Sequence, residues 1–250
     1  MKHLIIGSGV IGKATGIWLH TNNEKVIFND INEEVIEKIK TEYETTKKII
    51  NADIYWICTA EWDVENVLKT LDEDSTVIVR STTSPGTMVS LQKKHKHLKL
   101  IHNPEFLVQN EATIGIFNPD RIILGSSNQK ELRRIKNFYL RLIKCPVVTT
   151  DFTSSEMIKL TSNCWLATQI SYWNEIKTMC DKLKINPQAV SEAVTLDKRI
   201  SKYGSIMLGK PFAGFCLPKD TKAMKNLFNE HKIKSNVINA TIKTNKEVGK

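Results

Sequence analysis

The sequence predicts an α/β fold, in which a doubly wound parallel sheet is followed by an all-helical second domain. Two observations carry this prediction. Short apolar runs alternate with helical stretches over the first 150 residues, and one long amphipathic stretch begins the remainder. Such alternation favours a parallel sheet with helices on both faces. We expect domains at 1–150 and 151–250, because 250 residues can bury two modest cores.

Seven apolar runs of strand length are expected to form the sheet. These strands are expected at residues 4–6, 25–29, 54–58, 76–79, 99–101, 121–125 and 146–148. The clearest helices between them are expected at residues 13–19, 63–71 and 129–143.

The first strand runs directly into a glycine fingerprint, Gly7-Ser8-Gly9-Val10-Ile11-Gly12. Its first glycine makes a tight turn, the second lets backbone approach a pyrophosphate, and the third lets helix and strand pack closely. Asp30 follows the second strand, at about the spacing expected of the carboxylate that binds the adenosine ribose. An acid there repels a ribose phosphate. The pattern therefore predicts a Rossmann-type domain that binds NAD through Gly7, Gly9, Val10, Ile11, Gly12 and Asp30.

Composition argues against several other classes of protein. The net charge is +9, but the lysines are spread along the chain without an arginine-rich or aromatic-interleaved basic stretch, so we expect no nucleic-acid partner. No apolar run approaches the roughly 18 residues of a membrane span, so we expect no membrane association. The five cysteines form no C-x-x-C pair. We therefore expect a cytoplasmic protein with neither disulfides nor a metal site.

The expected second domain begins with one helix over 153–183, capped by the threonine and serines at 153–155. Glu156, Lys159 and Asn163 share one face of this helix. Lys159 and Asn163 can jointly donate hydrogen bonds to an oxyanion, or they can belong to a solvated stripe. Spacing alone leaves both interpretations open.

Cys216 has a setting that the other cysteines lack. It follows a small-residue turn, precedes Pro218, which can open a helix, and has Lys219 and Asp220 close behind it. A helix N-terminus and a nearby ammonium both lower the pKa of a thiol. We therefore expect Cys216 to be a nucleophile and not a buried structural cysteine.

Several further motifs run along almost the whole chain. The motifs are Asn103-Pro104-Glu105-Phe106-Leu107, Asn118-Pro119-Asp120-Arg121-Ile122, Glu156-x-x-Lys159-x-x-x-Asn163, Asn174-Glu175, Asp197-x-Arg199-Ile200 and Cys216-Leu217-Pro218-Lys219-Asp220. Together, and in this order, they resemble the UDP-glucose/GDP-mannose dehydrogenase family. The set is far more specific than any single motif.

The resemblance implies a four-electron oxidation of a nucleotide sugar, of the UDP-glucose or GDP-mannose type, from primary alcohol to carboxylate with two NAD. Cys216 would capture the intermediate aldehyde as a thiohemiacetal, which is oxidised to a thioester and then hydrolysed. Lys159 and Asn163 would stabilise the oxyanions. The sugar acid produced would serve polysaccharide synthesis.

The resemblance also implies roles for residues that pattern alone does not single out. Glu105 would be the base for thioester hydrolysis, and Thr82 would hold water near the nicotinamide. Asp220 would position water, and Lys219 would face the cofactor. Arg199 would reach a neighbouring subunit's substrate in a homodimer. The substrate contacts it implies are Glu105, Phe106, Leu107, Lys159, Asn163, Arg199, Gly214 and the segment 205–209.

The chain departs from the family pattern at four points. Thr59-Ala60-Glu61-Trp62 replaces a Pro-Thr-Pro-like turn after the third strand, where the family contacts its cofactor. Gln109 stands where the family carries a second acid, and an amide cannot exchange a proton. Pro211 and Ala213 replace two glycines before Cys216, which stiffens that loop. The chain also stops at Lys250, inside the expected connecting helix, so we expect a short form without the C-terminal nucleotide-binding domain.

Two other hypotheses remain open. A two-domain β-hydroxyacid dehydrogenase shares this architecture and uses a helix lysine, but it performs a single hydride transfer and needs no cysteine. A non-catalytic remnant would bind NAD or a sugar nucleotide and regulate or scaffold a partner. Gln109 and the expected absence of a third domain favour the remnant, whereas retention of Cys216, Lys159 and Asn163 opposes it.

Overall fold

The computed structural model describes residues 1–106 and 112–249. It contains two compact units, Met1–Lys159 and Leu160–Lys250. The division falls inside helix α7 (Phe152–Leu183), which begins in the first unit and continues in the second. The sequence-based boundary at residue 150 lies where the last strand ends. Leu107 and Gln109, singled out from the sequence, lie outside the described residues.

The first unit is built on one sheet of eight strands, in the order β3-β2-β1-β4-β5-β6-β7-β8. Neighbouring strands are parallel except β6 and β7. The strands are β1 (Lys2–Ile6), β2 (Lys25–Asn29), β3 (Thr45–Thr46), β4 (Ile54–Ile57), β5 (Thr76–Val79), β6 (Lys99–His102), β7 (Ile122–Gly125) and β8 (Val147–Thr150). All seven predicted strands are confirmed. Only β3 was missed, because two residues are too short to show an apolar pattern.

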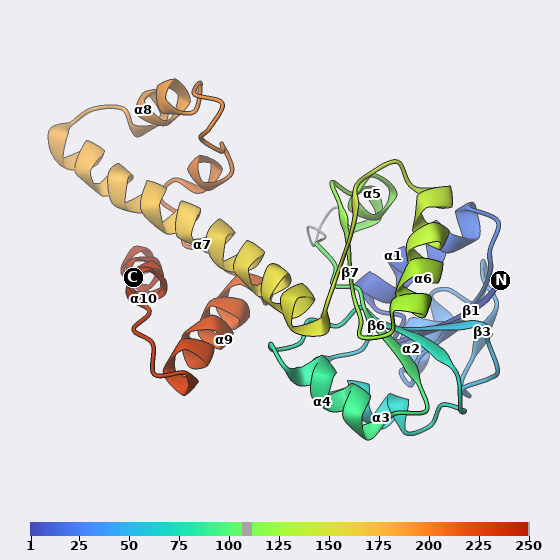
Figure 1. Ribbon diagram of the computed structural model, residues 1–250. Helices are drawn as coiled ribbons and strands as arrows, with labels where there is room; N and C mark the ends of the chain where they lie inside the picture. The colour runs from blue at the N-terminus through green and yellow to red at the C-terminus, as the bar shows by residue number, and fades with distance from the viewer. Residues whose placement is uncertain (107–111, 250) are drawn as a thin grey trace. The chain divides into compact units, whose positions relative to one another are not determined.

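Helices cover both faces of this sheet, with α1, α5 and α6 on one face and α3 and α4 on the other (Figure 1). The doubly wound, Rossmann-type fold predicted from the sequence is therefore confirmed. The helices of the first unit are α1 (Val10–Thr21), α2 (Glu33–Glu37), η1 (Glu61–Asp63), α3 (Val64–Leu68), α4 (Thr87–Lys94), α5 (Ala112–Phe117) and α6 (Gln129–Leu142).

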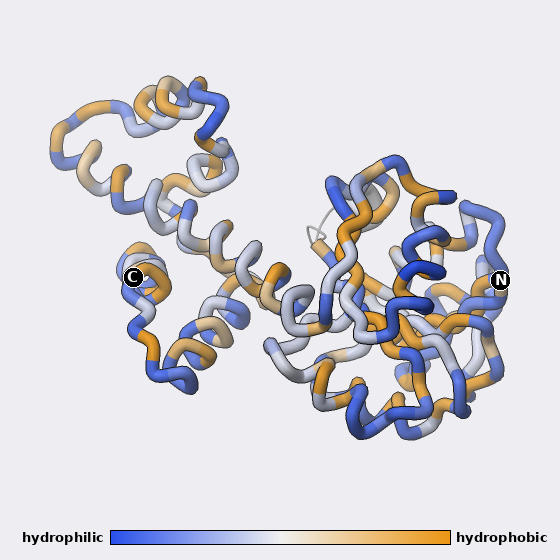
Figure 2. The backbone as a smooth tube through the Cα atoms, viewed as in Figure 1, coloured by the Kyte–Doolittle hydropathy of each residue, from blue (hydrophilic) through white to orange (hydrophobic). Residues whose placement is uncertain are grey.

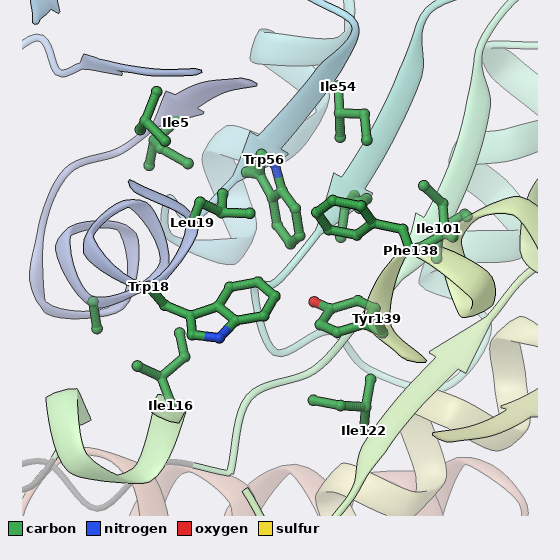
Figure 3. Close-up of a cluster of buried hydrophobic side chains, with 14 of the residues drawn as sticks. Ile5, Trp18, Leu19, Ile54, Trp56, Ile101, Ile116, Ile122, Phe138 and Tyr139 are labelled. Carbon is green, nitrogen blue, oxygen red and sulfur yellow. The ribbon is translucent and has the colours of Figure 1, made fainter. Parts of the chain in front are cut away.

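Successive side chains of each strand enter two different hydrophobic cores, because strand residues point alternately to opposite faces. In β4, Trp56 packs in the core beneath α1 and α6, whereas its neighbour Tyr55 packs in the core beneath α3 and α4. Figure 3 shows the first of these cores. There Trp18 of α1 stacks on Tyr139 of α6 with 5.5 Å between ring centroids. This packing holds α1, and with it the turn after β1, against the sheet.

The second unit, in the part of the chain described, is helical. Its elements after α7 are α8 (Pro187–Val194), η3 (Gly204–Met207), α9 (Cys216–Glu230) and α10 (Asn236–Val248). Figure 2 shows hydrophobic and hydrophilic positions interleaved along α7, as expected of a helix with one packed face. No helix among the described residues is long and apolar enough to cross a membrane.

Helix α7 is capped by Asp151, so the prediction that residues 153–155 cap it was wrong. The Asp151 carboxylate accepts hydrogen bonds from the backbone N–H of Ser154 at 2.8 Å and from its hydroxyl at 2.6 Å. Aspartate is among the best capping residues, and its charge also complements the helix dipole. The helix consequently begins one residue earlier than predicted, and Ser155 is buried inside its first turn, where it contacts His102.

Candidate active site

The chain turns sharply between β1 and α1. Gly7 has φ +87°, in the left-handed region that favours glycine. A Cβ on Gly12 would lie 1.8 Å from the carbonyl oxygen of Gly7, whereas a Cβ on Gly9 would meet nothing within 4 Å. Val10 and Ile11 form the first turn of α1 directly after it. The turn thus combines a tight bend, close helix packing and an open approach to a helix N-terminus, which suits a pyrophosphate.

Asp30 is held beside this turn, just after β2. Its carboxylate accepts hydrogen bonds from the backbone N–H of Ser8 at 2.7 Å and of Asn32 at 2.9 Å. Because β2 is the parallel neighbour of β1, Asp30 and the glycine turn lie at the same edge of the sheet. The chain passes from β1 to β2 on one side of β1 and later from β3 to β4 on the other side, which makes this edge the switch point where doubly wound sheets bind ligands. The residues present therefore fit NAD.

The turn that contains Thr82 is anchored by Glu156 of α7. The fully buried Glu156 carboxylate accepts hydrogen bonds from the hydroxyl of Thr83 at 2.8 Å and from the backbone N–H of Gly86 at 2.7 Å and of Met88 at 2.9 Å. Burial raises the pKa of this carboxyl group. Sequence reasoning placed Glu156 on a shared face with Lys159 but missed this role. A carboxylate directly after the uncharged first turn of α7 was the available signal.

Glu105, Phe106 and Lys159 meet in the first unit. The Lys159 ammonium donates to the Glu105 carboxylate at 3.1 Å, and both side chains are almost buried. The same ammonium lies 5.2 Å from the centre of the Phe106 ring, close enough for a cation–π interaction. A carboxylate that can take a proton and a cation that can donate hydrogen bonds are therefore adjacent.

A cavity of about 180 Å³ lies beside Glu105 and Phe106 in the first unit. Trp18 and Tyr139, which Figure 3 shows in the adjoining core, contribute to its wall. Ligand pockets are usually about 300–1,000 Å³, so this space suits part of a substrate such as one sugar ring and not a whole nucleotide sugar.

The second unit gathers Cys216, Asn163, Lys219 and Asp220 around the start of α9. Asp220 is 1% exposed and accepts hydrogen bonds from the Asn163 amide at 2.6 Å and from the Lys219 ammonium at 2.5 Å. Cys216 is the first residue of α9 and its thiol is exposed. An exposed thiol at a helix N-terminus, one turn ahead of a buried carboxylate, has the setting of a nucleophile.

Two further predicted residues, Arg199 and Gly214, also belong to the second unit. Arg199 is exposed and forms a bidentate pair with Asp197, with its Nη2 2.6 Å from a carboxylate oxygen. Gly214, with φ +75°, turns the chain two residues before Cys216. Lys219, expected to face a cofactor, is bonded to Asp220. The substrate and subunit contacts expected of Arg199 and Gly214 stay predictions.

A doubly wound sheet with this glycine turn and Asp30, continued by a helical unit with an exposed thiol at a helix N-terminus, defines an NAD-binding dehydrogenase-type protein. The chain belongs to the UDP-glucose/GDP-mannose dehydrogenase family. Residues 41–143 match the NAD binding domain of this family and residues 153–247 match its central domain. The glycine turn precedes the first matched residue and supports the same assignment independently.

Individual relatives agree with this membership. The UDP-glucose 6-dehydrogenase of Rickettsia prowazekii is 33% identical over 207 residues, which cover 80% of this chain and 47% of that protein. That of Rickettsia conorii is 29% identical over 290 residues, covering 99% and 67%. The solved UDP-glucose dehydrogenase of Pyrobaculum islandicum shares the fold, with a TM-score of 0.88 at 21% identity, covering 98% and 68%. The chain thus spans about half the length of the first relative.

Proposed function

We propose that this chain oxidises the primary alcohol of a nucleotide sugar, of the UDP-glucose or GDP-mannose type, to the carboxylate through a covalent bond to Cys216. The observation that carries the proposal is the arrangement at the start of α9. There the exposed Cys216 thiol lies one turn ahead of buried Asp220, which holds Asn163 and Lys219. Membership of the family supports the same reaction.

NAD, when bound, accepts a hydride in each of the two oxidations, so that two NAD are reduced per sugar. The glycine turn would hold its pyrophosphate at the N-terminus of α1. Asp30 would accept hydrogen bonds from the adenosine ribose hydroxyls. Glu156 contributes indirectly, because it keeps the turn bearing Thr82 in one conformation.

Cys216 would retain the sugar between the two oxidations. Its thiolate adds to the aldehyde carbon and forms a C–S bond, while the carbonyl electron pair moves to oxygen and takes up a proton. Loss of hydride from that carbon and of the hydroxyl proton then yields a thioester. A soft nucleophile is suited to this task because it holds a reactive aldehyde through the exchange of one cofactor for the next.

Lys159 and Asn163 would stabilise the negative oxygen that develops in these steps. Each side chain is held by a carboxylate in the structure, Lys159 by Glu105 and Asn163 by Asp220. A preformed hydrogen bond of this kind restricts a long side chain to few conformations, so that less entropy is lost when it binds the oxyanion.

Hydrolysis would complete the reaction. Water adds to the thioester carbon, its proton passes to Glu105, and the C–S bond breaks, returning the Cys216 thiolate and releasing the sugar acid. Thr82 would hold a water molecule near the nicotinamide, and Asp220 would position water close to Cys216.

The test is NADH production with UDP-glucose, GDP-mannose and UDP-N-acetylhexosamines, with the stoichiometry measured for each. Two NADH per sugar with one of the first two substrates is the expected result. One NADH per sugar would indicate the single hydride transfer of a hydroxyacid-type dehydrogenase. No NADH despite NAD binding would indicate a non-catalytic binding protein, and either result contradicts the proposal.

A further inference from the structure

The segment 209–215 joins η3 to α9 and ends at the residue before the proposed nucleophile. Gly209 with φ +76° and Gly214 with φ +75° turn the chain near its two ends, and Pro211 lies between them. Backbone groups in such an irregular segment still need hydrogen-bond partners. Its conformation therefore depends on what the neighbouring helices supply.

Asn174 of α7 binds the beginning of this segment. Its side-chain oxygen accepts a hydrogen bond from the backbone N–H of Gly209 at 2.6 Å, and its nitrogen donates to the carbonyl of Lys210 at 2.8 Å. Asn174 is 1% exposed. A buried amide that uses both of its ends on two successive residues sets the direction of the chain at that point.

Asn245 of α10 binds the middle of the segment in the same way. Its oxygen accepts from the backbone N–H of Phe212 at 2.7 Å, and its nitrogen donates to the carbonyl of Phe212 at 3.0 Å. Only Pro211 separates the two bound stretches, and its ring restricts φ while leaving no N–H to satisfy. Since the N–H of Lys210 bonds to the carbonyl of Met207 at 2.9 Å, every backbone N–H from 209 to 212 is satisfied.

Packing fixes the same stretch from its apolar side. Phe212 is buried in a cluster with Ala167 and Ile170 of α7, against which Leu217 of α9 packs. Helix α10 is in turn tied to α7, because the Ser171 hydroxyl donates to a carbonyl of α10, one turn before Asn245, at 2.9 Å. Asn245 is therefore held in register with the helix that carries Asn174.

We propose that Asn174 and Asn245 are positioning residues for Cys216, because together they hold the segment before α9 in one conformation and so keep the thiol at the helix N-terminus. The inference rests on the proposed function, since it is covalent capture of an aldehyde that needs a fixed nucleophile. Pro211 and Ala213, which the sequence predicts to stiffen this loop, act in the same direction. The segment 209–215 therefore has its conformation before substrate binds.

The test measures alkylation of Cys216 by iodoacetamide across a range of pH, followed by peptide mass spectrometry. The variants are Asn174→Ala and Asn245→Ala, with Asn239→Ala as the matched control. Asn239 lies on α10, as Asn245 does, and its side chain bonds to Ser235 at the start of that helix. Cys145, half-buried in the first unit, provides an internal reference in every sample. This readout needs neither NAD nor a nucleotide sugar.

We expect Asn174→Ala and Asn245→Ala to lower the alkylation rate of Cys216, relative to that of Cys145, by about threefold or more at neutral pH. The pH dependence of Cys216 alkylation should move to higher pH, because the thiolate loses a fixed helix N-terminus. Asn239→Ala should leave both unchanged. If Asn245→Ala does not fold, Asn245→Asp replaces it, since it keeps the acceptor for Phe212 and loses the donor. Alkylation at the wild-type rate in the folded variants would overturn the inference.

Turnover measured on the same variants separates this inference from the proposed function. Lost turnover with unchanged alkylation means that the asparagines do not act through Cys216, and the inference fails. If alkylation is slowed in the variants but the wild-type protein reduces no NAD with any nucleotide sugar, the positioning role is supported. The proposed function is then the one that is overturned.

Discussion

Each charged residue proposed to act in catalysis is held by another polar side chain of its own unit. Glu105 is bonded to Lys159 in the first unit, and Asp220 to Asn163 and Lys219 in the second. Charge-assisted hydrogen bonds of this kind are strong, and leaving one partner buried and alone is costly. The consequence at the scale of single residues is that removing one member of a group affects the others.

Replacing Cys216 by serine should abolish the second oxidation, because a hydroxyl is a poor nucleophile toward an aldehyde at neutral pH. We expect Cys216→Ser to lower net acid formation by about a thousandfold or more while NAD binding persists. Cys145→Ser is the control, since Cys145 lies in the other unit. Two NADH per sugar at the wild-type rate from Cys216→Ser would exclude the thioester route.

Asp220→Asn should destabilise the second unit, because the neutral amide loses its attraction for Lys219 and turns a donor toward Asn163 or Lys219. We expect a loss of about 2–4 kcal/mol in the free energy of unfolding, measured with urea. Asp197→Asn is the control, because its pair with Arg199 is exposed and solvent screens it; no measurable change in the free energy of unfolding is expected there. Equal changes in the free energy of unfolding for the two variants would show that the hydrogen bonds of Asp220 do not stabilise the second unit.

At the scale of elements, helix α7 supplies side chains to both units. Its first turns supply Glu156 and Lys159 to the first unit, and its later turns supply Asn163 and Asn174 to the second. The Glu156 carboxylate sits at the N-terminus of α4, where the helix dipole favours a negative charge. The turn bearing Thr82 is thus attached to α7 through one side chain.

Glu156→Gln should loosen the turn before α4, because one end of the amide is a donor that faces backbone N–H groups. We expect about 1–3 kcal/mol of destabilisation and a KM for NAD raised about threefold or more. Glu61→Gln is the matched control, since Glu61 accepts from Ser84 in the same turn at 3.0 Å but is exposed. An unchanged KM for NAD in Glu156→Gln would refute this role.

At the scale of the whole molecule, the positive charge is concentrated in one unit. Residues 160–250 contain 15 Lys and Arg against 7 Asp and Glu, a net charge of +8, whereas residues 1–159 carry +1. A strongly positive unit attracts anionic ligands over several ångströms, and salt screens that attraction. The lysines are spread along the whole chain, as the sequence shows, and the net charges differ because residues 160–250 hold few acidic residues.

This asymmetry predicts a salt-dependent affinity for a nucleotide sugar, whose diphosphate is negative. Under the proposed function, we expect KM for the sugar nucleotide to rise severalfold between about 0.05 and 0.3 M NaCl, with kcat nearly constant. Sucrose at matched osmolarity is the control for effects of water activity. A KM independent of salt would mean that the charge plays no part in substrate binding.

Three buried histidines predict how stability changes with pH. Burial lowers the pKa of His102 to about 4 and also lowers the pKa of His3 and of His95. The unfolded chain therefore binds more protons below about pH 6.5, and the free energy of unfolding decreases as pH falls from there toward the folded pKa values. Thermal unfolding from neutral pH to pH 5 measures this. His102→Asn should reduce the slope, and the exposed His97→Asn should not.

Local pattern was enough to predict seven strands, the glycine turn and the helix that begins at Cys216, because each depends on neighbours within a few residues. Asp30 was predicted from its spacing after the glycine fingerprint, although it bonds to Ser8, 22 positions away. The prediction failed at the N-terminal cap of α7. Residue 151 and residues 153–155 are all of types that cap helices, and the structure shows that Asp151 is the cap. The ion pair of Glu105 with Lys159 joins residues 54 positions apart. Periodicity in a sequence carries no information about such a pair.

The same reason applies to the groups that hold the proposed nucleophile. Asn174 belongs to one of the family motifs and Asn245 to none, but the sequence does not show what either side chain binds. Their four hydrogen bonds to the segment before Cys216 exist only once α7 and α10 pack around it. Motifs along the chain, read together with the family resemblance, therefore predicted which residues carry the chemistry. Packing between distant segments decided which side chains hold them in place, since a hydrogen bond depends on distance in space and not on distance in sequence.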